Sequence, residues 1–142
     1  MNTILELEKH LEEEGYSFQA ITIGKHHAPE GIIIEKEGNQ YLYAYSERGN
    51  KRILQSFSKE EDLVAYAWEQ LNSDRWMKAH LVAWVWSEDA ITKAEAELTS
   101  MKIKFERNDI PNYAKGKHAY RIFVFGNDVL RLAEFKRTYW EN

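Results

Sequence analysis

Two adjacent histidines, His26 and His27, with Glu30 shortly after them, are the most direct candidate for metal chemistry in this sequence. Imidazole and carboxylate groups are good ligands for zinc and other transition metals. Neighbouring side chains in an extended segment point in opposite directions, so both rings rarely reach one ion. The spacing also differs from standard zinc sites such as His-Glu-x-x-His. We therefore expect a plain loop here and no metal site.

The common catalytic and cofactor motifs are missing. The chain has no Cys, which excludes disulfides, thiolate catalysis and cysteine-ligated metal clusters. It has no Gly-x-Ser-x-Gly elbow, no Gly-x-Gly-x-x-Gly and no Walker-type Gly-Lys-Ser. Its 23 acidic residues make accidental carboxylate pairs unavoidable. We expect no catalytic residue, cofactor or small-molecule substrate, although a cleft joining His80 or His118 to carboxylates would favour an enzyme.

A candidate partner-binding surface lies in the first half of the chain. Residues 1–71 hold 13 acids against 7 bases, and the segment from Gln40 to Glu47 places three tyrosines on one face of a strand. Tyrosine rings and surrounding carboxylates suit a basic protein partner. The tyrosines could equally pack beneath a helix. The candidate binding residues are Glu12, Glu13, Glu14, Glu35, Glu37, Tyr41, Tyr43, Tyr45 and Glu47.

The second half supports a different hypothesis, that of an RNA-associated or regulatory binding protein. Residues 72–142 hold 10 acids against 12 bases. Aromatic residues that could stack on bases are interleaved with cations, namely Lys102, Lys104, Phe105, Arg107, Tyr113, Lys115, Lys117, Tyr120 and Arg121. The net charge of −4 opposes general binding to phosphate, so we expect no direct contact with nucleic acid.

The pattern of apolar residues predicts an α+β fold with a mainly antiparallel sheet. We expect a single domain, residues 1–142, with 1–73 and 74–142 as a weaker two-module alternative. Capping boxes at Thr3 and Ser58 start two helices, and Ser87 and Gly126 precede two more. A four-stranded meander is predicted at 17–24, 31–37, 40–47 and 53–57. Further strands are expected at 79–86, 102–106 and 119–125, with a loop over 108–117.

The expected compartment is the cytoplasm. The N-terminal residues place acids where a signal peptide needs a basic start. The longest apolar run, Leu81 to Trp86, is far shorter than the roughly 20 residues of a membrane span. We expect no membrane partner.

Three segments resemble small bacterial immunity proteins that neutralise polymorphic toxins: the first 18 residues, KEEDLVAYAWEQL at 59–71, and FKRTYW at 135–140. The resemblance extends over most of the chain and assigns no individual functional residue. It implies a cytoplasmic inhibitor that binds the C-terminal toxin domain of a contact-delivered protein. In the most similar system that domain is a nuclease acting on tRNA. Such a nuclease must be basic where it holds phosphate, which fits an acidic inhibitor.

Overall fold

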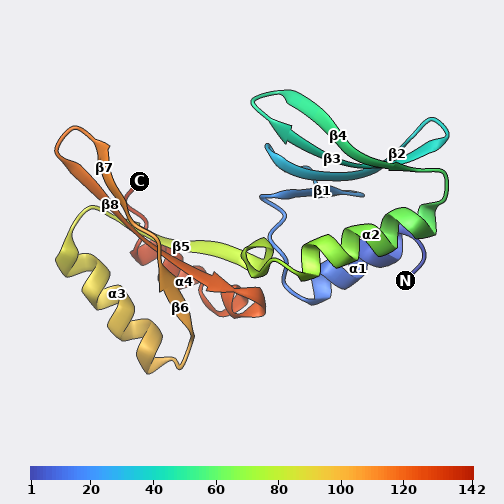
Figure 1. Ribbon diagram of the computed structural model, residues 1–142. Helices are drawn as coiled ribbons and strands as arrows, with labels where there is room; N and C mark the ends of the chain where they lie inside the picture. The colour runs from blue at the N-terminus through green and yellow to red at the C-terminus, as the bar shows by residue number, and fades with distance from the viewer. The chain divides into compact units, whose positions relative to one another are not determined.

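The computed structural model describes residues 1–142, and these form two compact units: an N-terminal unit, Met1–Met77, and a C-terminal unit, Lys78–Asn142. Each unit contains its own sheet (Figure 1). The α+β class and the mainly antiparallel pairing are confirmed. The boundary between the units follows Met77, four residues beyond the position considered for two modules. None of the helices has the length and apolar composition needed to cross a membrane.

In the N-terminal unit, two helices cover one face of a four-stranded sheet (Figure 1). The strands lie side by side in the order β1-β2-β3-β4, and β2, β3 and β4 form the predicted antiparallel meander. The elements are α1 (Ile4–Glu13), β1 (Ile21–Ile23), β2 (Gly31–Glu37), β3 (Gln40–Glu47), β4 (Asn50–Phe57) and α2 (Glu60–Asn72). A 3₁₀ helix, Arg75–Lys78, follows α2.

The first strand departs from the prediction because β1 pairs parallel, not antiparallel, with β2. A turn closed by hydrogen bonds between Ile23 and His26 reverses the chain after β1. The loop then runs back along β1, so that Ile32 of β2 starts beside Ala20 and donates its N–H to the Ala20 carbonyl at 2.9 Å. β2 therefore runs in the same direction as β1. No residue pattern in the loop predicts this second reversal.

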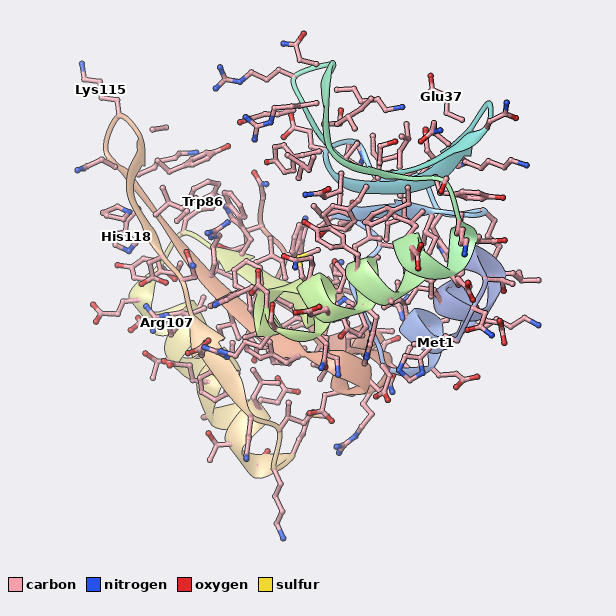
Figure 2. All side chains as sticks on the ribbon, turned by 45° about the vertical axis from the view of Figure 1, so that its right-hand side comes forward. Met1, Glu37, Trp86, Arg107, Lys115 and His118 are labelled. Atoms are coloured by element: carbon pink, nitrogen blue, oxygen red, sulfur yellow. The ribbon has the colours of Figure 1, made fainter.

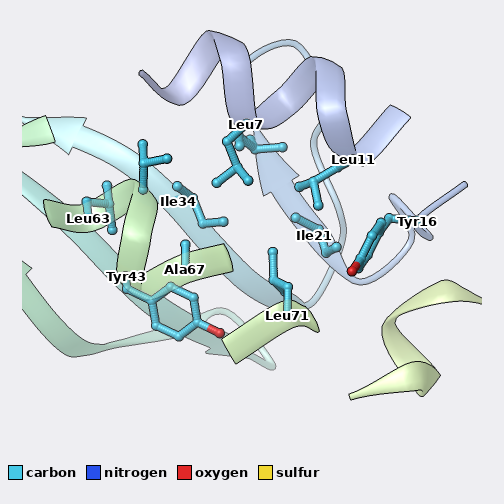
Figure 3. Packing of buried hydrophobic residues seen from close by; sticks show 11 residues of the cluster. Leu7, Leu11, Tyr16, Ile21, Ile34, Tyr43, Leu63, Ala67 and Leu71 are labelled. Atoms are coloured by element: carbon cyan, nitrogen blue, oxygen red, sulfur yellow. The ribbon is translucent and has the colours of Figure 1, made fainter. Parts of the chain in front are cut away.

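Apolar residues at helical spacing on α1 and α2 meet the inner face of the sheet (Figure 3). The Thr3 capping box is confirmed, since the Glu6 N–H donates to Thr3 Oγ1 at 3.1 Å. The capping box predicted at Ser58 is wrong, because α2 starts one residue later and its N-cap, Lys59, makes no side-chain cap. The buried residues of this core are Leu7, Leu11, Tyr16, Ile21, Ile23, Ile34, Tyr43, Leu63, Val64, Ala67 and Leu71.

The C-terminal unit places β8 at the centre of its sheet, with β5 and β6 on its two sides and β7 pairing with its first residues. The elements are β5 (Ala79–Val85), α3 (Glu88–Ser100), β6 (Phe105–Arg107), β7 (Ile110–Ala114), β8 (Lys117–Phe125) and α4 (Ala133–Thr138). The loop predicted over 108–117 is wrong where it contains β7, and the predicted last helix begins as a 3₁₀ helix, Gly126–Arg131. Phe105 starts β6, later than predicted.

The core of this unit packs α3 and α4 against the sheet. The N–H of Trp84 on β5 donates to the Tyr139 carbonyl at 2.9 Å, and the Glu141 N–H donates to the Trp84 carbonyl at 2.8 Å. The C-terminal segment is therefore tied to the edge of β5. The core residues are Val82, Ala83, Val85, Ile91, Ala94, Leu98, Ile103, Ile122, Val124, Leu132 and Phe135.

Candidate functional site

Two tyrosines of the predicted stripe, Tyr41 and Tyr43, face the core. Tyr43 is 5% exposed, and its ring makes an edge-on contact with Tyr66 of α2, with 5.1 Å between centroids. Burial raises the pKa of Tyr43 to about 12. Tyr41 packs against the same core, and Tyr45 is half-buried. The alternative in which the tyrosines pack beneath a helix is therefore the correct one for Tyr41 and Tyr43, and a partner-binding role for Tyr43 is contradicted by its burial.

Two of the predicted acids, Glu35 and Glu37, lie on the opposite face of the sheet from Tyr43. Tyr43 pairs with Ile34, and side chains alternate between faces along a strand, so Glu35 points away from the helices. Lys51 of β4 places its Nζ 3.0 Å from a carboxylate oxygen of each of these two acids. Their hydrogen bonds raise the pKa of Lys51. Glu35 and Glu37 therefore share one lysine, which compensates one of their two negative charges.

The remaining predicted acids are spread over two further places. Glu12 lies at the end of α1, with its Oε2 2.6 Å from His26 Nε2 and 3.5 Å from Lys25 Nζ. The hydrogen bond from His26 is the main reason that the pKa of Glu12 is lowered. Glu13 and Glu14 are exposed at the same helix end. Glu47 lines a shallow hollow of about 420 Å³ at the β3–β4 turn. The structure does not gather the nine predicted residues into one surface.

An acidic surface that the sequence analysis missed lies on α2. Glu61, Asp62 and Glu69 are exposed, and none of them takes part in an ion pair. Asp62 and Glu69 share a face of α2, because a spacing of seven residues is about two helical turns. The capping box predicted at Ser58 assigned Glu61 to helix initiation and drew attention away from its exposure. The whole N-terminal unit holds 14 acids against 8 bases.

His26 does meet carboxylates, but not the one expected from the sequence. His27 is exposed, and Glu30 accepts a hydrogen bond from the Arg48 N–H at 3.2 Å. Glu8 and Glu12 of α1 approach His26 instead, and the potential ligand atoms of these three residues all lie within 4.8 Å of one another. The only trace in the sequence is the four-residue spacing of Glu8 and Glu12, which places both on one helix face.

The C-terminal unit carries a cluster of aromatic rings and cations, which we call the Trp86 cluster: Trp84, Trp86, Tyr113, Lys117 and Arg121. The Lys117 ammonium lies 4.7 Å from the Trp86 ring, and Tyr113 packs against the same ring and is 48% exposed. The buried indole N–H of Trp84 has no hydrogen-bond partner. Figure 2 shows Lys115 at the tip of the neighbouring β7–β8 hairpin.

The arginines next to this cluster are already engaged. Asp109 accepts hydrogen bonds from Arg107 Nε at 3.0 Å and from the Arg121 N–H at 3.1 Å. Burial alone would raise the pKa of Asp109, but these bonds and the Arg107 charge lower it overall. The Arg121 guanidinium donates to Asn108. Two of the six predicted nucleic-acid cations, Arg107 and Arg121, are therefore partly occupied within the unit.

Of the two histidines considered for a hidden enzyme site, His118 lies beside a carboxylate, and the two histidines are far apart on the sheet. His80 of β5 pairs with Val124, whereas His118 lies six residues before Val124 on β8. Six residues of strand correspond to about 20 Å. His118 Nε2 is 3.4 Å from Asp109, a carboxylate that Arg107 already binds.

No model of a known protein family, no curated protein and no solved structure matches this chain.

Proposed function

We propose that this chain is an immunity protein that acts in the cytoplasm by binding the C-terminal domain of a contact-delivered toxin and blocking it without turnover. The observation that carries the proposal is the exposed, unpaired acidic surface of α2 in a unit of net charge −6. A toxin that cleaves tRNA must present cations where it holds phosphate. Carboxylates on a rigid helix can occupy those cations and exclude the substrate.

The acidic surface of α2 replaces the residues predicted from the sequence as the proposed contact with the toxin. Glu35, Glu37 and Glu12 already have cationic partners, so they offer a partner less uncompensated charge than Glu61, Asp62 and Glu69. A charged surface of this kind speeds encounter more than it lengthens the lifetime of the complex. We therefore expect association that slows steeply as salt is added, with a total buried area of about 1,200–2,000 Å².

The test is to produce this chain with the C-terminal domain of the protein encoded immediately upstream and to measure growth, complex stoichiometry and association rate. Glu61→Lys with Asp62→Lys should slow association about tenfold or more at low salt and weaken protection. The matched control is Glu88→Lys with Asp89→Lys, because that exposed pair occupies the same first turn of a 13-residue helix in the other unit. Equal association rates in the two variants, or a wild-type rate indifferent to salt, would contradict the role of α2.

A second candidate, an RNA-associated protein, is favoured by one observation, the exposed Tyr113 beside Trp86 and Lys117. Bases stack on exposed aromatic rings, each worth about 1–3 kcal/mol. A gel-shift assay with tRNA and no protein partner separates the two proposals. Tight binding that Trp86→Ala abolishes would reverse the ranking, whereas an immunity protein should leave bare tRNA unbound.

A further inference from the structure

We propose that Glu8, Glu12 and His26 form a binding site for a divalent transition-metal ion, with Zn²⁺ as the best fit. Two carboxylates of α1 and one imidazole from the turn after β1 converge there, with all their ligand atoms within 4.8 Å of one another. His26 Nε2 lies 2.6 Å from Glu12 Oε2 and 3.8 Å from Glu8 Oε2. This is a mixed nitrogen and oxygen donor set on two separate elements.

The burial of Glu8 is the strongest observation in favour of a bound cation at this site. The residue is only 5% exposed, and a buried carboxylate is costly unless a cation or hydrogen bonds compensate it. The Lys25 N–H donates to its Oε2 at 2.9 Å, and the same oxygen lies 3.8 Å from His26 Nε2. A carboxylate oxygen has two lone pairs, so Oε2 can keep this hydrogen bond and still bind an ion.

The backbone leaves room for this carboxylate through a glycine. Gly24 has φ +56°, and a Cβ at this position would lie 2.4 Å from Glu8 Oε2. No side chain larger than hydrogen can be accommodated there without moving Glu8, and the left-handed backbone also favours glycine. Glycine at position 24 therefore lets the turn after β1 approach Glu8 more closely than a residue with a side chain would allow.

His26 is held in place by contacts that do not involve its ligand nitrogen. Its ring stacks on Phe18, with 3.7 Å between centroids and 13° between planes. Paired backbone hydrogen bonds between Ile23 and His26 fix the turn that presents it. A ligand held by its supporting contacts needs little ordering when an ion arrives.

The distances are compatible with zinc after a small adjustment. Zinc bonds of about 2.0–2.2 Å place tetrahedral ligand atoms about 3.4 Å apart. The contact between His26 and Glu12 must open by somewhat less than 1 Å and that between His26 and Glu8 must close by about half an ångström, which modest side-chain rotations can supply. Binding displaces the proton of Nε2 that otherwise joins His26 to Glu12. Lys25 Nζ, now 3.5 Å from Glu12, sits on a side chain that is 75% exposed and can move away.

The donor set distinguishes between ions. One imidazole with two carboxylates suits Zn²⁺ or Mn²⁺, whereas Ca²⁺ and Mg²⁺ prefer oxygen ligands alone. Three protein ligands leave a fourth position for water or for a group of a partner. A bound ion would fasten α1 to the turn between β1 and β2 and so stabilise the N-terminal unit.

The experiment is a calorimetric titration of the full chain, stripped with chelator and free of a histidine tag, with ZnCl₂, together with thermal melts. We expect one ion per chain and a higher Tm with zinc. Glu8→Gln and His26→Gln should each weaken zinc binding at least tenfold. His27→Gln is the matched control, since His27 is an exposed neighbour in the same loop, and it should bind zinc like the wild type.

A measurement on the unaltered protein guards against variants that fail to fold. In long-range ¹H–¹⁵N spectra, zinc should shift the ring nitrogens of His26 and leave those of His27 unchanged. Weak, unsaturable zinc binding, or equal losses from His26→Gln and His27→Gln, would overturn the proposal. Unchanged His26 resonances at a saturating zinc concentration would do the same.

Discussion

The two units are built from similar elements but handle their charged residues in opposite ways. In the N-terminal unit a carboxylate, Glu8, is buried beside His26. In the C-terminal unit Asp109 binds Arg107, and two further cations, Arg121 and Lys117, lie over tryptophan rings. The net charges follow, −6 for the first unit and +2 for the second. The charges available to a partner are therefore those that remain after the ion pairs and hydrogen bonds within each unit have formed.

The largest expected effect tests whether each unit is stabilised by its own core. Leu11 of α1 and Leu98 of α3 are both fully buried, one in each core. Replacing either with Ala should cost about 3–5 kcal/mol, from lost burial and the cavity left behind. Hydrogen exchange followed by mass spectrometry should show lost protection in residues 1–77 for Leu11→Ala and in residues 78–142 for Leu98→Ala. Uniform loss in both variants would mean that the units unfold as one.

The next largest effect on stability concerns Asp109, which accepts hydrogen bonds from Arg107 and from the Arg121 N–H in the C-terminal unit. Its lowered pKa means that the folded state favours the ionised form, which stabilises the protein above the ordinary pKa of 3.8. Asp109→Asn should therefore destabilise the C-terminal unit at pH 7 by about 1–2 kcal/mol. The difference from the wild type should shrink as the pH falls below 3.8 and Asp109 takes up its proton in the folded state. Urea unfolding at pH 7 and pH 3 measures it, and a difference independent of pH would contradict this role.

Helix caps give a smaller effect that can be matched between the units. Thr3 caps α1 within a capping box, and Ser87 caps α3 by accepting the Ala90 N–H at 3.2 Å. Thr3→Ala and Ser87→Ala should each cost about 1 kcal/mol. Hydrogen exchange should localise each loss to the first turn of the helix concerned. A cost near zero for Thr3→Ala would show that the hydrogen bond from the Ile4 N–H to Glu60 anchors α1 without the cap.

The smallest effect is seen only at high pH. Because burial raises the pKa of Tyr43 to about 12, this side chain should stay neutral when ordinary tyrosines ionise near 10. The stability that it contributes in its neutral form is complete below pH 10 and is lost as the pH rises through 12. Burial also raises the pKa of Tyr16 and Tyr139, so a spectrophotometric titration should show several late tyrosines, of which Tyr43→Phe removes one. If that variant leaves the titration unchanged, Tyr43 is not one of the late groups.

Local patterns predicted some elements closely and others poorly, for identifiable reasons. The bounds of β2 and β3 are as predicted, because a β-branched run and a strict alternation flank the Gly38-Asn39 turn. β4 starts at Asn50, three residues early, since its first residues are polar and are ordered by pairing with β3. β7 was missed because Pro111 and Asn112 are typical of loops, and only its pairing with β8 makes it a strand.

Local spacing and composition were enough to predict the α+β class, most of the helices and the acidity of the first half. Which side chains come into contact depends on the three-dimensional fold. In the folded protein Tyr43 is buried beneath α2, Lys51 forms ion pairs with Glu35 and Glu37, and His26 lies close to Glu8. Such contacts depend on strand register and on where the chain reverses. The turn after β1 is fixed by backbone hydrogen bonds, which no pattern of residue types predicts.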